Sequence, residues 1–213
     1  TQIKSVNSAF SLFSVKTGML ATADLVAVVA CFVREHPELP LIVDPVLRAG
    51  AGNLLLSNEG LERLKTELLP LARIVTPNLP EAEILLGEPI LTPEAFLTSP
   101  QRLHQRYGCD FLVKGGHFIE GDPSIITDHA WIAGESRTFS RLRLAVPDLH
   151  GTGCTLSAAI AAQIALGHDT TTAISAATRY LAACMEQHFS WSSGGVSIEA
   201  LNHFPDGVEF SRS

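Results

Sequence analysis

The amino-acid sequence predicts an α/β fold in which a mostly parallel central sheet carries helices on both faces. Short runs of apolar and β-branched residues alternate with longer segments of helical periodicity, a pattern that indicates βαβ units. Several short runs end in polar or glycine-rich residues, as strands of an open α/β sheet do at a ligand site. With 213 residues, 46% hydrophobic and 17% charged, the chain is long enough to bury a sizeable core. We therefore expect one domain covering residues 1–213.

The first part of the chain supplies the parallel strands. A helical pattern over residues 1–9 leads into a strand at 14–17. Further apolar runs predict strands at 41–46, 73–76 and 111–114. Helical periodicity between the strands predicts helices at 22–36, 58–69, 80–86 and 93–107. Because a doubly wound domain normally opens with a strand, we expect the chain to begin inside its fold.

The pattern changes after the fourth strand. Residues 124–133 and 136–145 form two extended runs that turn at Gly134-Glu135, which predicts a late antiparallel hairpin. Two further helices are expected at 155–166 and 170–188. The tail after Trp191 is predicted to be irregular.

Composition limits the classes of partner. The chain has 15 basic and 22 acidic residues, a net charge of −7, and no basic cluster stands out. This balance argues against nucleic acid and anionic membranes as partners. No apolar run is long enough to span a membrane. The widely spaced cysteines form no zinc pattern and, with no secretory signal, predict a cytoplasmic protein; they are Cys31, Cys109, Cys154 and Cys184.

Polar groups follow each of the four predicted parallel strands. In open α/β sheets, ligands bind in the crevice beyond the carboxyl ends of the strands, so we expect the site at this rim. The groups concerned are Lys16-Thr17-Gly18, Asp44-Pro45-Val46, Thr76-Pro77-Asn78 and Lys114-Gly115-Gly116-His117.

The segment His150-Gly151-Thr152-Gly153-Cys154 precedes an alanine-rich helical pattern. Two glycines allow a tight turn that brings backbone amides close to a ligand. The helix start would then offer free N–H groups and a positive dipole end to phosphate or to a developing oxyanion. Cys154 lies in the first turn, where the same field is expected to favour its thiolate. Ordinary helix packing is the alternative reading of Cys154.

Each rim residue also has a structural interpretation. Asp44 suits Mg²⁺ or a reacting hydroxyl, and it equally suits the turn into Pro45. Asn78 and Glu81 have the spacing of a helix capping box, which by itself outweighs a role in arranging Mg²⁺ waters. Lys114 could place its charge on a phosphate or lie at a sheet edge.

Together these residues supply the parts that phosphoryl transfer needs: carboxylates for Mg²⁺, a lysine and preorganised amides. The chain contains no P-loop and no protein-kinase signature. A kinase of another architecture is therefore the hypothesis that the residues favour.

Five motifs in order resemble those of the hydroxymethylpyrimidine/phosphomethylpyrimidine kinases of thiamine biosynthesis, which belong to the ribokinase-like superfamily. The resemblance extends from Thr1 to about His188. The motifs are Lys16-Thr17-Gly18-Met19-Leu20, Asp44-Pro45-Val46-Leu47, Thr76-Pro77-Asn78-Leu79-Pro80-Glu81-Ala82, Val113-Lys114-Gly115-Gly116-His117 and His150-Gly151-Thr152-Gly153-Cys154.

The resemblance implies transfer of the γ-phosphoryl group of ATP to 4-amino-5-hydroxymethyl-2-methylpyrimidine and then to its monophosphate, with Mg²⁺. Cys154 matches the position beside the hydroxymethyl group, where we expect a lowered pKa to help activate the hydroxyl. The other matches are Gly151, Thr152 and Gly153 for the anion hole, Lys114 for the phosphates, Asp44, Asn78 and Glu81 for the Mg²⁺–phosphate network (Asp44 and Glu81 through water), and Met19 and Val46 for the pyrimidine. The resemblance leaves a homodimer open.

Three departures from the family pattern are visible. We expect the chain to lack the family's first βα unit, with its opening strand and glycine-rich substrate loop. Asp148-Leu149 stands where Asn-Thr is common, and Ala49-Gly50-Ala51-Gly52 replaces a stretch that often carries Lys-Ser. Two alternatives therefore stay open beside the pyrimidine kinase. One is a pyridoxal kinase, which shares the fold and much of the rim. The other is a catalytically silent protein that binds nucleotide or pyrimidine.

Overall fold

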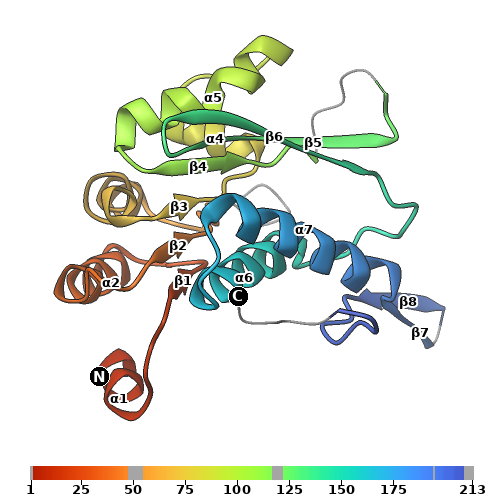
Figure 1. Ribbon diagram of the computed structural model, residues 1–213, viewed down its shortest axis with the longest axis horizontal. Coiled ribbons are helices and arrows are strands. Elements are labelled where there is room, and N and C mark those ends of the chain that lie inside the picture. The colour runs from red at the N-terminus through yellow and green to blue at the C-terminus, as the bar shows by residue number, and fades with distance from the viewer. Residues whose placement is uncertain (1, 48–54, 117–121, 194, 209–213) are drawn as a thin grey trace.

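The structure is a computed structural model that describes residues 2–47, 55–116, 122–193 and 195–208. Six strands form the central sheet in the order β1-β2-β3-β4-β5-β6, and a separate ribbon contains β7 and β8. Helices lie on both sides of the sheet (Figure 1). The predicted α/β fold with a late antiparallel hairpin is confirmed.

The first four strands run parallel and end at the same rim. They are β1 (Val15–Thr17), β2 (Leu41–Val43), β3 (Ile74–Val75) and β4 (Asp110–Val113). Thr17 pairs with Val43, and Val43 pairs with Val75. Because this register is not staggered, the residues that follow the strands are brought to one edge of the sheet.

The antiparallel part of the sheet contains β5 (Ile125–Ile132) and β6 (Glu135–Leu142). Ile132 pairs with Glu135, so the two turn residues are Ala133 and Gly134, one position earlier than predicted. Their φ values are 50° and 83°. A two-residue hairpin turn of this class needs positive φ at both positions, which places Glu135 in the strand.

Two helical layers bury the two faces of the parallel strands. Val43, Val75 and Phe111 face α2 (Ala23–Glu35), α4 (Leu79–Leu86) and α5 (Pro93–Tyr107) within one apolar cluster. Ile42, Ile74 and Leu112 belong to a second cluster with α6 (Thr152–Ala165) and α7 (Thr170–Glu186). Strands buried on both faces read as continuous apolar runs, which is why their positions could be predicted.

Three segments differ from the prediction. The helix expected at 58–69 is divided into α3 (Asn58–Arg63), a π-helical turn at Leu64–Leu68 and a 3₁₀ turn at Leu69–Leu71. Pro70 lacks the backbone N–H that a continuing helix requires. Helix α6 begins at Thr152, three residues before the predicted start, and the tail expected to be irregular forms β7 (Phe189–Ser193) and β8 (Val196–Ala200).

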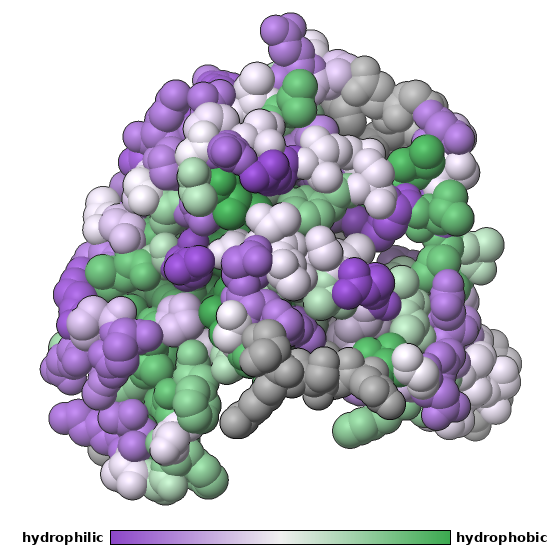
Figure 2. All heavy atoms as spheres, viewed as in Figure 1, coloured by the Kyte–Doolittle hydropathy of each residue, from purple (hydrophilic) through white to green (hydrophobic). Residues whose placement is uncertain are grey.

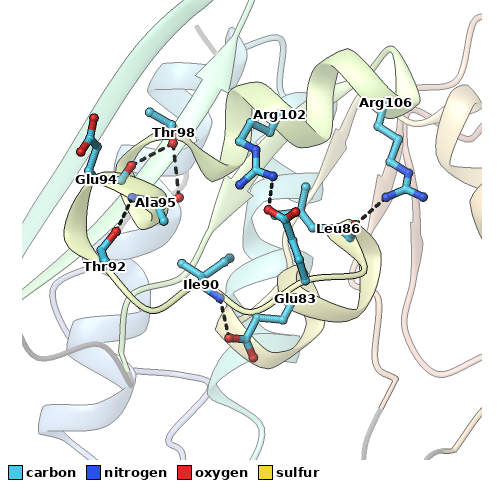
Figure 3. Close-up of polar contacts among 10 residues, drawn as sticks. Glu83, Leu86, Ile90, Thr92, Glu94, Ala95, Thr98, Arg102 and Arg106 are labelled. Carbon is cyan, nitrogen blue, oxygen red and sulfur yellow. Dashed lines mark hydrogen bonds and ion pairs between the residues drawn. The ribbon is translucent and has the colours of Figure 1, made fainter.

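Helix α4, which begins at the rim, is fixed at its other end by contacts with α5 and with its own connecting loop (Figure 3). Arg106 Nη1 donates to the carbonyl oxygen of Leu86 at 2.6 Å, and the amide of Ile90 donates to Glu83 Oε1 at 2.8 Å. Arg102 pairs with Glu88 across the same junction. These contacts hold the orientation of α4 and therefore the place of its first turn.

The β1 side of the molecule exposes apolar surface. Helix α1 (Gln2–Ala9) has no buried residue and lies apart from the sheet (Figure 1). Figure 2 shows hydrophobic patches between polar ones over α1 and α2. The exposed apolar side chains of this region include Val6, Phe10, Phe13, Leu25 and Val28. Within the described ranges, no helix has both the length and the apolar character that crossing a membrane requires.

Candidate active site

Two lysines and one aspartate meet at the carboxyl ends of the parallel strands. Lys16 Nζ lies 3.8 Å from Asp44 Oδ2, and Lys114 Nζ lies 3.4 Å from Asp44 Oδ1. Asp44 is only 2% exposed, so water screens these charges weakly. The three side chains carry one net positive charge when ionised, which favours an anionic ligand at this rim.

The start of α6 closes one side of this cluster. The Ser157 hydroxyl lies 3.2 Å from Asp44 Oδ2 and 3.0 Å from the carbonyl oxygen of Cys154, and its single proton can donate to either oxygen. A Cβ atom on Gly153 would lie 3.0 Å from Lys114 Nζ, so a glycine here lets the lysine approach the first turn. Gly151 precedes the helix with φ 87°, a left-handed conformation that suits glycine. Thr152, partly exposed, is the first helical residue.

The expectation that the helix start favours a Cys154 thiolate is wrong. Desolvation raises the pKa of the thiol above its ordinary value, and the negative charge of Asp44 raises it further. A side-chain hydrogen bond with Asp44 also stabilises the protonated form, against the opposing charges of Lys16 and Lys114. The residue as a whole is exposed, although its thiol is partly desolvated.

Asn78 and Glu81 form the complete capping box of α4. Asn78 Oδ1 accepts from the amide of Glu81 at 2.9 Å, and Glu81 Oε2 accepts from the amide of Asn78 at 2.8 Å. The structural interpretation of this pair is therefore confirmed. Desolvation raises the pKa of Glu81, while the nearby Lys114 charge lowers it. The carboxylate of Glu81 is therefore close enough to the Lys114 ammonium for their charges to interact.

Asp44 and Glu81 are carboxylates close enough for their charges to interact, which is the kind of side-chain pair that can hold a hydrated Mg²⁺ ion. Mg²⁺ in kinases is bound through one or two carboxylates, several waters and the substrate phosphates. The hydroxyls of Thr17, at the end of β1, and of Thr76, which follows β3, are buried and have no hydrogen-bond partner among the described residues. Such orphaned polar atoms are satisfied most simply by ordered water. No cluster of three or more His, Cys, Asp or Glu side chains that could bind a metal directly was found in the described part of the chain.

A cavity of about 480 Å³ opens beside Cys154. Small side chains on α6 form its floor, and Tyr180 and His203 line another side. Its volume is in the range of small-molecule sites. The Tyr180 hydroxyl donates to the carbonyl oxygen of His203 at 2.9 Å, which fixes the segment after β8 against α7.

A family model described as phosphomethylpyrimidine kinase matches residues 1–199. The chain belongs to the phosphomethylpyrimidine kinase family. A hydroxymethylpyrimidine/phosphomethylpyrimidine kinase from Haemophilus influenzae is 32% identical over 194 residues, which are 91% of this chain and 72% of the relative. One from Staphylococcus aureus is 36% identical, and the match covers 79% of this chain but only 60% of the relative.

Solved structures agree with the fold. An ADP complex of Bacillus subtilis pyridoxal kinase superposes with a TM-score of 0.80 at 26% identity, covering 95% of this chain and 73% of that chain. Phosphomethylpyrimidine kinase from Clostridium difficile gives a TM-score of 0.72 at 29% identity, covering 85% of this chain and 72% of that chain. Pyrimidine and pyridoxal kinases are therefore both relatives of this family member.

The rim residues expected from the sequence are only partly brought together by direct contacts. Asp44 and Lys114 are in contact, and the first turn of α6 lies beside both. Lys16 was expected at the rim but was given no role, and Ser157 was not predicted at all, although both contact Asp44. Met19 is exposed just beyond β1 and Val46 is partly exposed beyond β2, so their contact with a pyrimidine stays a prediction. His117 and residues 49–52 lie outside the described part of the chain.

Proposed function

We propose that this chain phosphorylates 4-amino-5-hydroxymethyl-2-methylpyrimidine and its monophosphate, with ATP as donor and Mg²⁺ as cofactor. The observation that carries the proposal is the convergence of Lys114, Asp44 and the start of α6 at one rim. A lysine and helix-terminal amides stabilise charge that develops on a transferring phosphoryl group. Membership of the phosphomethylpyrimidine kinase family gives the substrate class.

Each residue has a role in this proposal. Lys114 binds the phosphates, and the backbone N–H groups around Gly151, Thr152 and Gly153 donate hydrogen bonds to the transferring phosphoryl group. Asp44, Asn78 and Glu81 arrange the waters of Mg²⁺, which when bound neutralises phosphate charge. Met19 and Val46 pack on the pyrimidine. Cys154 lies beside the acceptor hydroxyl as a protonated thiol, because its pKa is raised.

We further propose a single kinase domain in a cytoplasmic protein that binds no nucleic acid and forms a homodimer. The four cysteines support this compartment, because none of them is paired in a disulfide in the structure. The exposed apolar residues along the β1 side support self-association.

A pyridoxal kinase is the second candidate. The TM-score of 0.80 with the Bacillus subtilis pyridoxal kinase favours it, and that superposition covers nearly the whole chain. The two candidates differ in acceptor and share the phosphate-binding rim, so only the acceptor distinguishes them.

The test is ADP release by the purified 213-residue polypeptide with Mg²⁺-ATP and each acceptor: the pyrimidine, its monophosphate and pyridoxal. We expect turnover with both pyrimidines, and loss of at least about 100-fold in Lys114→Met, a loss typical of a group that stabilises transition-state charge. Lys65→Met is the matched control, because Lys65 pairs with Glu62 on an outer helix. Turnover with pyridoxal alone selects the second candidate. A folded chain, by circular dichroism, that turns over none of the three contradicts the proposal.

A further inference from the structure

The turn that follows β4 is held by the antiparallel hairpin. The backbone N–H of Gly115 donates to Asp128 Oδ1 at 2.8 Å. Asp128 lies on β5 and is 1% exposed, and its other oxygen, Oδ2, pairs with Arg141 on β6. Because both oxygens of the carboxylate have charge-assisted or amide partners, its orientation is set from two strands.

The backbone on either side of Lys114 has little freedom. A Cβ atom on Gly115 would lie 1.8 Å from the carbonyl oxygen of Thr127, so the turn packs directly on β5. On the other side, the amide of Lys114 donates to the carbonyl oxygen of Pro77 at 2.9 Å. Lys114 is therefore held between the end of β3 and the start of the hairpin.

The position of the Lys114 ammonium depends on this backbone. Its Nζ atom lies 3.4 Å from Asp44 Oδ1, and it lies 3.0 Å from where a Cβ on Gly153 would be. With contacts this close on both sides, a small rotation of the turn moves the ammonium away from the start of α6. A displacement of about 1 Å in a catalytic group can reduce turnover ~100-fold.

We propose that Asp128, anchored by Arg141, is a positioning residue that sets the Lys114 ammonium for the transferring phosphoryl group. The inference rests on the proposed kinase function and extends it to two residues of the β5–β6 hairpin. The β5–β6 hairpin thus supplies the carboxylate that orients the backbone of the phosphate-binding lysine.

The chain contains a matched control in Asp110. Asp110 lies at the start of β4, and its Oδ1 accepts from the amide of Ala133 at 3.1 Å. This bond also joins β4 to the hairpin through a carboxylate and an amide, but at the opposite end of β4 from Lys114. Asp110→Ala therefore removes the same kind of contact from the same junction without touching the turn.

The experiment compares Asp128→Ala, Asp128→Asn, Arg141→Met and Asp110→Ala by kcat, KM for Mg²⁺-ATP and melting temperature. We expect Asp128→Ala to lower kcat by about tenfold to 100-fold, with a smaller change in KM, because the lysine is misplaced and not removed. Arg141→Met should lower kcat less than Asp128→Ala does. Asp128→Asn should keep most of the parent's kcat, since asparagine retains an oxygen that can accept from the Gly115 amide. Asp110→Ala should lower the melting temperature and leave kcat within about twofold.

The outcomes separate the two proposals. A parent chain without turnover contradicts the kinase function and this inference together. A parent chain that turns over, with kcat unchanged in Asp128→Ala and Arg141→Met, overturns the positioning role alone. If Asp128→Ala does not fold, Arg141→Met decides the question, because Asp128 keeps its bond to Gly115 there and only loses its anchor. An unchanged kcat in that variant then overturns the inference.

Discussion

Cys154 and Asp44 interact at the start of α6, and the interaction changes what the cysteine can do. A helix N-terminus by itself stabilises a thiolate. Here desolvation and the adjacent carboxylate oppose that field, and the pKa of the thiol is raised. A thiol that stays protonated at neutral pH is suited to contact an acceptor hydroxyl and is poorly suited to remove its proton. The Asp44 carboxylate, with both lysines beside it, is the anionic group of this cluster.

The raised pKa of the Cys154 thiol predicts slow alkylation of this residue. Iodoacetamide reacts with thiolates, so at pH 8 the raised pKa should make Cys154 react more slowly than a thiol in an unstructured peptide. Asp44→Asn removes the carboxylate charge that raises the pKa and should speed the reaction, whereas Lys16→Met should slow it. One unit of pKa changes the thiolate population about tenfold at a pH below both values. Peptide mapping by mass spectrometry gives the rate for Cys154 separately from the other cysteines.

The raised pKa of Cys154 also makes the stability of the folded chain depend on pH. Ionising Cys154 is harder in the folded chain than in the unfolded chain, so its contribution to stability is present at low pH and is lost as the pH rises through the folded-state pKa. If Cys154 is alkylated faster than the peptide thiol at pH 8, the helix terminus lowers the pKa of the thiol more than Asp44 and desolvation raise it.

Single residues of the rim could be predicted from the sequence, but the contacts between them could not. Asp44 and Lys114 could be predicted because each directly follows an apolar strand. Lys16 was visible at a strand end, yet its contact with Asp44 depends on the register in which Lys16 pairs with Ile42. Ser157 and Asp44 are 113 positions apart in the chain. Their contact depends on how α6 packs on the sheet, which a local sequence pattern does not reveal.

Helix α4 depends on a cap that lies inside the candidate site. We expect Asn78→Ala to lower the free energy of unfolding by about 1 kcal/mol, the usual cost of losing an N-cap side chain. Turnover should fall as well, because the first turn of α4 carries Glu81 beside Lys114. Denaturant titration and the ADP-release assay measure the two effects.

Thr92→Ala provides the comparison, because the Thr92 hydroxyl caps α5 by accepting from the amide of Ala95 at 3.2 Å (Figure 3). Neither Thr92 nor Ala95 belongs to the proposed phosphate or Mg²⁺ network. The Thr92→Ala variant should lose similar stability and keep its turnover, and Asn78→Ser should regain the stability of the parent. Equal loss of turnover in Asn78→Ala and Thr92→Ala would show that activity follows stability and not the position of Glu81.

Strand positions and helix periodicity could be predicted locally, whereas the helix irregularities could not, and the signal for the last ribbon was missed. The π-helical turn at Leu64–Leu68 has no separate signature in the apolar pattern, which continues through it. The β7–β8 ribbon did have a signal. Phe189 and Trp191 alternate with serines before two glycines, and Ile198 follows in a second alternating run. Two alternating runs around Gly-Gly indicate a hairpin.

The two edge strands of the central sheet, β1 and β6, differ in how well they are protected against pairing with a strand of another molecule. Strand β6 has eight residues and carries Glu135, Arg137 and Arg141, charges that discourage another strand from pairing. Strand β1 has three residues, and its one charge, on Lys16, is turned toward Asp44. Phe10 and Phe13 are exposed just before it. The β1 edge is therefore where association of the 213-residue polypeptide is expected to occur.

We predict that this polypeptide self-associates with rising concentration, as measured by light scattering after size exclusion, and that Phe10→Asp/Phe13→Asp shifts it toward monomer. The matched control is Ile125→Asp/Leu142→Asp, which alters two exposed apolar residues on the β6 side and should leave association unchanged. Each copy carries a net charge of −7, so the copies repel one another. Salt screens repulsion between exposed charges over a Debye length of about 8 Å at physiological ionic strength. Association should therefore strengthen with added salt, and a monomer at every concentration and salt level would show that the β1 edge is not an interface.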